Sequence, residues 1–375
     1  MSDTSYWLDE SAEIPTGPRH TGAVDVAIVG GGVTGCACAL TLAQAGARVR
    51  LHEARTIASG ASGRNGGFAL RGGAMLYDRA VETLGAEHAS AFWRLTERAL
   101  DRMEELAGDA FRRVGSLRLA ADEKERGELR AESDALLADG FAVEWLDELP
   151  EQLAGRYLGA ILHPGDGALQ PARWVRRLAA HAAEAGAELR EHARVSSLDE
   201  LEADHVVIAS DGYPSGLLAA LDGAVQPTRG QIVTTEPLPE LLYDRPHYAR
   251  QGLDYWQQLP DGRLVAGGRR DAAHEAEFTA EEATTEPVQA ALESLVRDLV
   301  GRLPSITHRW SGIFGTTADR LPLVGAVPEH SGLWVARGYS GHGNVLGLAS
   351  GELVANAILG RREPELELFD PARVL

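Results

Sequence analysis

The chain has 375 residues, of which 44% are hydrophobic, so it is long enough for one large domain or two interleaved ones. Its formal net charge of -19 disfavours nucleic acids and anionic membrane surfaces as partners. The two cysteines, Cys36 and Cys38, lie two positions apart in a predicted helix and point to different faces, so neither a disulfide nor a metal site is expected there. No stretch resembles a signal peptide or a membrane span, and we expect a soluble cytoplasmic protein.

The first predicted elements are a strand, a tight turn and a helix. The apolar run from Val24 to Val29 is followed by Gly30, Gly32 and Gly35 in GxGxxG spacing, and then by an Ala/Leu-rich helical pattern. The first glycine would allow the turn, the second would let a pyrophosphate approach the backbone, and the third would let the helix pack closely on the strand. The helix N-terminus would offer free N–H groups and a partial positive charge to phosphates.

A second apolar run, residues 49–52, ends in Glu53, which is placed to accept hydrogen bonds from a ribose diol. Strand, turn, helix, second strand and terminal acid in this order predict dinucleotide binding rather than an ordinary glycine-rich turn. A second glycine-dense stretch, "ASGASGRNGG" at 58–67, follows at once. A flavin dinucleotide needs a second backbone cradle along its ribityl chain, so this stretch favours FAD over a nicotinamide cofactor.

The middle of the chain supplies packing elements and a second sheet. Residues 85–108 and 121–139 are predicted helices, and a helix starting near Pro171 precedes a strand that ends around Val195. An apolar strand at 205–209 breaks at "SDG". Residues 226–310 alternate short strands with turns and one helix near 281–302, which predicts a sheet on the substrate side. The C-terminal part returns to strand, glycine loop and a helix beginning near Asn344, so the fold class is α/β with a discontinuous nucleotide-binding domain.

Four separated motifs resemble those of the D-amino-acid oxidase superfamily of FAD-dependent oxidoreductases: the GxGxxG unit with Glu53, "GASGRNGG", "VVIASDG" and "GYSGHGNV". With "DYWQQLPDGRLVAGG" they are most similar to the branch of gamma-glutamylputrescine oxidase, glycine oxidase and sarcosine oxidase. The resemblance implies a Rossmann-like FAD-binding domain of the glutathione-reductase type, at 1–84, 151–225 and 311–375. A substrate domain with a mostly antiparallel sheet and helices would be interleaved with it, at 85–150 and 226–310.

The resemblance also implies which residues contact FAD from its adenosine end to its flavin ring. Gly30, Gly32, Thr34 and Gly35 would lie at the pyrophosphate and Glu53 at the adenosine ribose, with Val195 facing the adenine and Gly212 beside the nucleotide. The ribityl chain and the flavin edge would be contacted by Ser62, Arg64, Asn65, Gly66 and Gly67. The pyrimidine end of the flavin would be contacted by Gly338, Gly341, His342, Gly343, Asn344 and Val345. A helix N-terminus at this last loop would stabilise negative charge on the reduced flavin.

Two departures from the family pattern change the expected chemistry. Sarcosine oxidases attach the flavin through a cysteine in a segment resembling "SGIFGTTADRLPLVG", which here contains none, so we expect noncovalent FAD. Those enzymes also use two lysines, one to activate oxygen and one to hold the substrate carboxylate. The single lysine of this chain is Lys124, and the matching positions are Val265 and Val345. Neither fast reaction with oxygen nor specificity for α-amino acids is therefore carried over.

The candidate catalytic residues are His342, Tyr255, Trp256 and Arg269. His342 would contact the flavin, the two aromatic rings would form a wall over it, and Arg269 with its neighbour Arg270 would hold a substrate carboxylate. The leading hypothesis is FAD-dependent oxidation of a primary or secondary amine by hydride transfer to flavin N5, with oxygen or an electron carrier as acceptor. The alternatives are an oxidase of the D-amino-acid, glycine or sarcosine type and a flavin-binding protein without turnover. No metal-ligand spacing is found.

Overall fold

The computed structural model describes residues 4–375 and contains three sheets. The six-stranded sheet has the order β16-β17-β10-β1-β2-β9, and all its pairings are parallel except that of the edge strand β16 with β17. Its strands are β1 (Val24–Val29), β2 (Val49–His52), β9 (Glu188–Arg190), β10 (Ala203–Ile208), β16 (Leu323–Ala326) and β17 (Leu333–Arg337). These strands are short, and most residues of β1, β2, β16 and β17 are buried, as is typical of a parallel sheet covered on both faces.

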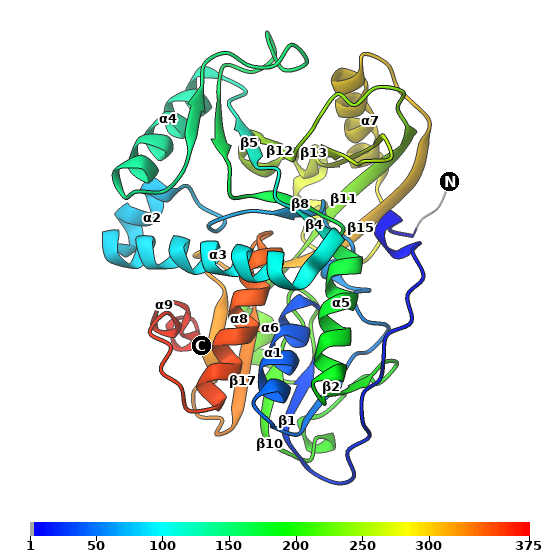
Figure 1. Cartoon of the computed structure of the whole chain (residues 1–375), viewed down its shortest axis with the longest axis vertical. Helices are drawn as coiled ribbons and strands as arrows, with labels where there is room; N and C mark the ends of the chain where they lie inside the picture. Colours follow the sequence, from blue (N-terminus) through cyan, green and yellow to red (C-terminus); the bar gives the residue numbers. More distant parts are fainter. Residues whose placement is uncertain (1–3) are drawn as a thin grey trace.

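Three helices lie side by side along one face of this sheet: α1 (Val33–Gln44), α5 (Pro171–Glu184) and α8 (Gly343–Ile358) (Figure 1). The close contact between α1 and α8 depends on glycine. A Cβ atom at Gly351 would lie 2.4 Å from the carbonyl oxygen of Thr34, and one at Gly347 would lie 2.6 Å from the Val33 side chain. This contact brings the N-terminus of α8 beside the N-terminus of α1.

The eight-stranded sheet has the order β15-β11-β14-β13-β12-β5-β7-β6 and is antiparallel apart from the β12–β5 pair. Its strands are β5 (Ser116–Leu119), β6 (Glu144–Leu146), β7 (Ala160–His163), β11 (Gln226–Pro237), β12 (His247–Ala249), β13 (Asp254–Gln258), β14 (Arg263–Gly268) and β15 (Ile306–Thr316). Helix α7 (Glu286–Val300) packs on β11 and β14, and α4 (Glu123–Ala138) packs near β6 and β7. Both lie in the upper part of Figure 1.

Smaller elements join the two sheets. A three-stranded sheet contains β3 (Phe68–Ala69), β4 (Phe111–Arg112) and β8 (Gly167–Leu169). The long helix α3 (Ala86–Ala107) packs on α5 and α8, and α2 (Tyr77–Leu84) packs on α3 and α4. The remaining α-helices of the described residues are α6 (Ala219–Ala224) and α9 (Leu366–Phe369). The predicted α/β fold with a mostly antiparallel second sheet is therefore confirmed.

Several boundaries differ from the sequence prediction. The strand expected to end around Val195 ends at Arg190. The helix expected from residue 281 begins at Glu286, with Thr285 as its N-cap. Strand β7 belongs to the eight-stranded sheet although it lies in the 151–225 segment, and β15 crosses the boundary at 310/311. The sheets thus cross the predicted domain boundaries, and the division into two domains stays a prediction.

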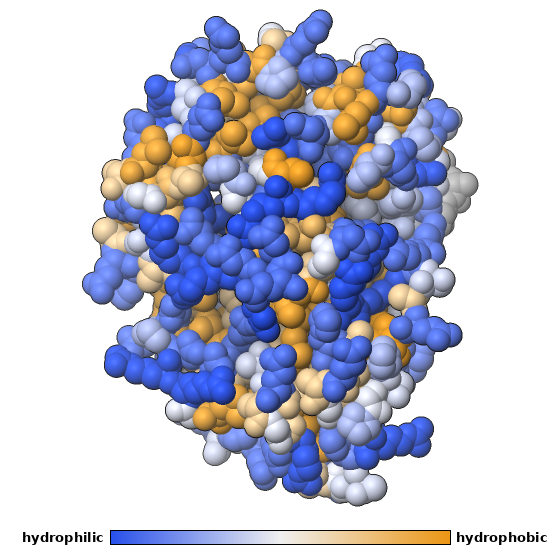
Figure 2. Space-filling model, in the orientation of Figure 1, coloured by the Kyte–Doolittle hydropathy of each residue, from blue (hydrophilic) through white to orange (hydrophobic). Residues whose placement is uncertain are grey.

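Figure 2 shows polar side chains over most of the visible face, with apolar side chains in scattered patches. Within residues 4–375, no helix has both the length and the apolar character needed to cross a membrane. In the same part of the chain no group of three or more His, Cys, Asp or Glu side chains is arranged to hold a metal ion. Cys36 and Cys38 are buried free thiols in α1, and burial raises the pKa of both.

Candidate functional site

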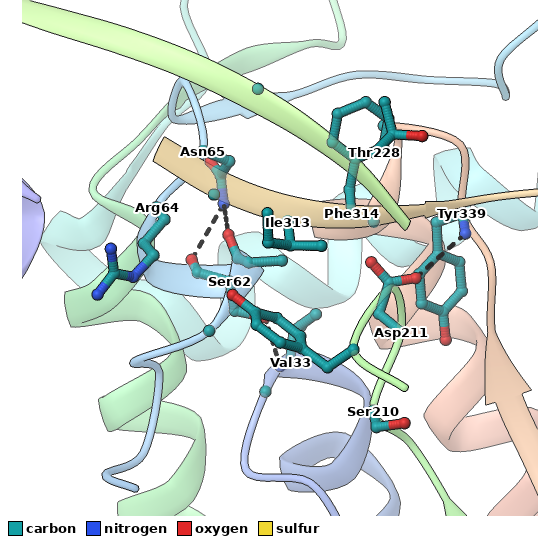
Figure 3. Close-up of a pocket in the computed structure, with 18 of the residues that line it drawn as sticks. Val33, Ser62, Arg64, Asn65, Ser210, Asp211, Thr228, Ile313, Phe314 and Tyr339 are labelled. Carbon is teal, nitrogen blue, oxygen red and sulfur yellow. Dashed lines mark hydrogen bonds between the residues drawn. The ribbon is translucent and has the colours of Figure 1, made fainter. Parts of the chain in front are cut away.

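A cavity of about 770 Å³ lies between the carboxyl ends of the central parallel strands and the eight-stranded sheet (Figure 3). Its nucleotide side is formed by the loops that follow β1, β2 and β10. Its other side is formed by β11, β13, β15 and the loop before α8. Such a position, outside the carboxyl ends of parallel strands, is where α/β folds bind nucleotides.

The loop between β1 and α1 has the backbone shape of a phosphate cradle. Gly30 has φ 118°, and a Cβ there would lie 2.5 Å from the Ala209 carbonyl oxygen, so only glycine fits. Gly32 faces Ser62, whose hydroxyl oxygen accepts a hydrogen bond from the Val33 N–H at 3.1 Å. Gly35 does not line the cavity. A Cβ there would lie 1.9 Å from the Gly30 carbonyl oxygen, so this glycine serves the packing of helix on strand.

Glu53 lies at the end of β2 and is held in place by two backbone donors. Its carboxylate accepts hydrogen bonds from the Gly31 N–H at 2.8 Å and from the Arg55 N–H at 2.7 Å, one on each oxygen. Each oxygen keeps a free lone pair for a further donor. The geometry therefore fits a carboxylate that accepts hydrogen bonds from a ribose diol. Val195 also lines this end of the cavity.

The second glycine-rich loop is joined to the start of α8 by two side-chain amides. Asn65 donates to the Asn344 side-chain oxygen at 3.1 Å, and Asn344 donates back to Asn65 at 3.0 Å. Asn65 also donates to the carbonyl oxygens of Ala61 and Ser62 (Figure 3). Of the predicted flavin contacts, the cavity is lined by Ser62, Arg64, Asn65, Gly66, Gly341, His342, Gly343, Asn344 and Val345.

Four predicted cofactor contacts do not line the cavity: Gly35, Gly67, Gly212 and Gly338. At Gly35, Gly67 and Gly212 an added Cβ would collide with backbone atoms, so these glycines allow close backbone packing. A Cβ at Gly67 would lie 2.4 Å from the Leu169 carbonyl oxygen, and one at Gly212 would lie 2.3 Å from the Phe314 backbone. Thr34 lines the cavity, but its hydroxyl is already hydrogen bonded to that of Tyr339 at 2.8 Å.

The turn after β10 holds a buried carboxylate and an unpartnered hydroxyl that the sequence did not single out. Asp211 accepts hydrogen bonds from the backbone N–H groups of Gly315, Gly338 and Tyr339, at 2.9 to 3.4 Å. Burial nevertheless raises its pKa. Through these hydrogen bonds Asp211 links the turn after β10 to β15 and to the loop after β17. Ser210 lines the cavity, and its buried hydroxyl has no hydrogen-bond partner among the described residues.

The two aromatic candidates lie on opposite faces of β13. Tyr255 lines the cavity and packs edge to face on Phe68, with ring centroids 5.8 Å apart. Trp256 is fully buried on the other face, where it stacks on His247 with centroids 5.1 Å apart. The expectation that Trp256 forms a cavity wall is therefore wrong, because consecutive side chains of a strand point to opposite faces.

The two neighbouring arginines also separate. Arg269 does not line the cavity. Its side chain pairs with the buried Asp254, with Nε 2.7 Å from Oδ1, so the expectation that Arg269 holds a substrate carboxylate is wrong. Arg270 lines the cavity, where its guanidinium lies 6.0 Å from the centroid of the Phe314 ring. Among the described residues, no carboxylate pairs with Arg270.

His342 is the N-cap residue of α8 and lines the cavity. Its Nδ1 is buried without a hydrogen-bond partner in the described part of the chain. Burial, followed by the positive charge of Arg118, lowers its pKa to about 4. The imidazole is therefore neutral at neutral pH and can exchange a hydrogen bond with a bound molecule. Its ring lies edge to face with Tyr248, at a centroid distance of 6.5 Å.

The cavity fits FAD as judged from the residues present. At one end lies the Glu53 carboxylate, which suits a ribose. The glycine cradle at the N-terminus of α1 follows, and the N-terminus of α8 lies at the other end beside aromatic rings. Two buried polar atoms facing it, Ser210 Oγ and His342 Nδ1, have no partner in the described residues, as expected where a polar ligand supplies one. Neither cysteine lines the cavity. Of the two valines at the positions of the sarcosine oxidase lysines, Val345 lines the cavity and Val265 does not.

The chain is similar in sequence to known proteins along most of its length. Residues 25–357 match the DAO family, described as FAD dependent oxidoreductase. The chain is 30% identical to the probable oxidoreductase OrdL of Rhizobium meliloti, over 99% of this chain and 91% of that protein. It is 28% identical to the gamma-glutamylputrescine oxidoreductase of Escherichia coli, over 90% of this chain and 84% of that protein.

A similar solved structure is that of glycine oxidase from Geobacillus kaustophilus. It is 28% identical in sequence, the alignment covers 95% of this chain and all of that one, and the TM-score is 0.79. The family match spans both sheets and every loop that lines the cavity. The membership predicted from the four motifs is confirmed: the chain belongs to the DAO family of FAD-dependent oxidoreductases.

Proposed function

We propose that this enzyme oxidises a primary or secondary amine with noncovalently bound FAD, and that oxygen or an electron carrier then accepts the electrons. The observation that carries the proposal is the cavity itself, in which a dinucleotide cradle continues into an end bounded by Tyr255, Phe314 and the neutral His342. Bound FAD would supply the two-electron acceptor for a hydride from the amine α-carbon. The resulting iminium ion would lose a proton to give an imine, which water would hydrolyse. The E. coli relative named above acts on an amine according to its name.

The chain's own residues orient the amine and keep it neutral. The rings of Tyr248, Tyr255 and Phe314 line the substrate end and exclude water from it. The guanidinium groups of Arg270 and Arg320 line the same cavity. Their positive charges disfavour the protonated form of an amine nearby. His342, held neutral by burial, exchanges a hydrogen bond with the substrate and is not required as a base.

A second candidate function rests on Arg270. An arginine without a carboxylate partner in a cavity is suited to bind a substrate carboxylate through two hydrogen bonds. That contact would favour an amino acid of the D-amino-acid, glycine or sarcosine type over a simple amine.

A substrate panel without oxygen separates the two candidates. The protein is mixed anaerobically with primary and secondary amines and with glycine, sarcosine and D-amino acids, and bleaching of the flavin absorbance is followed. We expect bleaching by amines without a carboxylate. Bleaching by the amino acids alone would favour the second candidate, and bleaching by none would contradict both. Readmitted air or an added dye then identifies the acceptor, and acid denaturation should release intact FAD into the supernatant.

The role of His342 has its own test. We expect His342→Ala to bind FAD and to be reduced by amine more slowly but completely, because hydride transfer from a neutral amine needs no obligatory base. Complete loss of reduction with FAD still bound would show that the imidazole is a catalyst.

A further inference from the structure

The motif Thr228–Gln231, in the sequence "TRGQ", has no role in the proposed chemistry. It lies on β11, and its residues alternate between two faces. Thr228 and Gly230 line the cavity, whereas Arg229 and Gln231 are buried on the other side. The question is what these two polar side chains hold there.

They hold the two ends of residues 277–285, the later half of the connection between β14 and α7. The Arg229 guanidinium forms two hydrogen bonds with the buried carboxylate of Glu277, at 2.9 and 3.0 Å. The Gln231 side chain donates to Glu277 at 3.0 Å and to the Thr285 hydroxyl at 2.7 Å, and it accepts from the Thr285 N–H at 2.9 Å. Residues 277–285, here called the clasp, are therefore fixed to β11 at each end.

Between its fixed ends the clasp borders the cavity, which Phe278, Ala280 and Glu282 line. The Glu282 carboxylate pairs with Arg55 Nη1 at 2.8 Å, lies 3.5 Å from Arg64 Nη2 and accepts a hydrogen bond from the Tyr213 hydroxyl at 2.5 Å. The Arg55 guanidinium also lies 5.3 Å from the centroid of the Tyr213 ring. One carboxylate from the substrate-side segment thus joins two loops of the nucleotide side.

These contacts lie at the dinucleotide end and not at the substrate end. Arg55 is two residues past Glu53, and its backbone N–H binds the Glu53 carboxylate. Tyr213 packs over Gly60, where an added Cβ would lie 3.3 Å from its ring. The Arg55 and Glu282 side chains are 39% and 21% exposed, so the pair can open without unfolding the core.

We propose that the clasp retains FAD, and that the contacts of Glu282 with Arg55 and Tyr213 close the cavity over the adenosine half of the cofactor. The inference rests on the FAD-binding part of the proposed function and not on the amine. A noncovalent cofactor leaves only when its cavity opens, and the Glu282 contacts are the ones that must break to lift the clasp. Glu282, Arg55 and Tyr213 are therefore binding residues that set how fast FAD leaves.

The experiment measures the FAD release rate after dilution of the holoprotein, from the recovery of free-flavin fluorescence. We expect Glu282→Gln to release FAD about three- to tenfold faster, the range for a partly exposed charged pair. Tyr213→Phe, which removes a single hydroxyl, should change the rate in the same direction by less. The matched control is Glu281→Gln, an exposed neighbour with the same charge change, and its release rate should stay unchanged.

A double-mutant cycle then tests the pairing. If Arg55 acts through Glu282, the variant carrying Arg55→Gln and Glu282→Gln releases FAD no faster than the faster single variant. Added salt should speed release from the unmodified protein and have less effect on Glu282→Gln. Equal release by the Glu282 and Glu281 variants, or release rates that multiply in the double variant, would overturn the clasp. If no amine bleaches the flavin but the variants release FAD as expected, the proposed substrate is contradicted and the clasp is not.

Discussion

The nucleotide side and the substrate side of the cavity differ in how they are built. The nucleotide side is made of continuous loops, such as those at 30–34 and 60–66, in which neighbouring residues act together. The substrate side takes single side chains from separate strands, such as Tyr255 from β13 and Phe314 from β15. The residues that a continuous loop needs can be recognised in one stretch of sequence. A wall of single side chains cannot, because it depends on how strands far apart in the chain pair.

The largest expected effect comes from breaking the nucleotide side at Gly32. We expect Gly32→Val to abolish FAD binding. Its Cβ would lie 2.9 Å from Ser62 Oγ, which anchors the cradle, and its methyl groups would occupy the phosphate approach. The flavin content per chain and titration of the apoprotein with FAD measure the effect. Gly127→Val, at an exposed site with nothing near its Cβ, is the control, and full flavin content in Gly32→Val would show that this turn is not the cradle.

The substrate side is tested by the two neighbouring rings of β13. We expect Trp256→Ala to lower the free energy of unfolding by about 3–5 kcal/mol, because it opens a cavity in the core behind the sheet. Tyr255→Ala should instead raise the amine KM by roughly three- to thirtyfold through loss of an aromatic contact. Urea unfolding and steady-state kinetics measure the two quantities. A Trp256 variant of normal stability with a raised KM would reverse the assignment of the two faces.

These particular residues show how far the sequence alone was sufficient. Gly30, Gly32 and Glu53 were expected together and do line the cavity, because the contacts proposed for a phosphate and a ribose demand fixed residue types at fixed spacing. The strand face of Tyr255 and Trp256 could not, because both rings suit a cavity wall and a core equally well. Arg269 and Arg270 differ only through Asp254, a partner that folding brings to the first of them. The sequence predicted Glu282 to lie in a helix near 281–302, but the helix begins at Glu286, so the contact of Glu282 with Arg55 had no local signal.

The rear face of the eight-stranded sheet also predicts a pH effect on stability. Burial lowers the pKa of His247 to about 4, from about 6.5 in an unfolded chain. Its stabilising contribution is therefore complete above pH 6.5 and is lost as the pH falls towards 4, by about 3 kcal/mol.

We expect His247→Gln to be less stable than the unmodified protein at pH 7 but to lose less stability on acidification to pH 4. The exposed His88→Gln is the control. Urea unfolding at each pH measures the loss of stability on acidification, and the two variants are compared with each other. The comparison is needed because His52 and His342 also have lowered pKa values, while the raised pKa of Asp166 has the opposite effect on stability. Parallel pH curves for the two variants would contradict the prediction.

The smallest effect is expected at Gly343, where the nucleotide side meets the substrate side. Gly343 is the first residue of α8 and lines the cavity, and first-turn N–H groups of a helix have no intrahelical acceptor. Gly343→Pro removes one such N–H and also disfavours the present backbone of His342, whose ψ is 26°.

If this helix end stabilises negative charge on reduced FAD, the variant loses a charge-assisted hydrogen bond worth about 1.5–3 kcal/mol. For a two-electron couple, about 30 mV corresponds to 1.4 kcal/mol, so the reduction potential should fall by about 30–60 mV. Gly343→Ala keeps the N–H and adds a Cβ 3.2 Å from the Tyr339 ring, which makes it the control for crowding. FAD affinity should change little in either variant, because the Gly30–Val33 cradle is intact. A potential that is equal in the Pro and Ala variants would mean that the N–H of Gly343 does not act on the flavin.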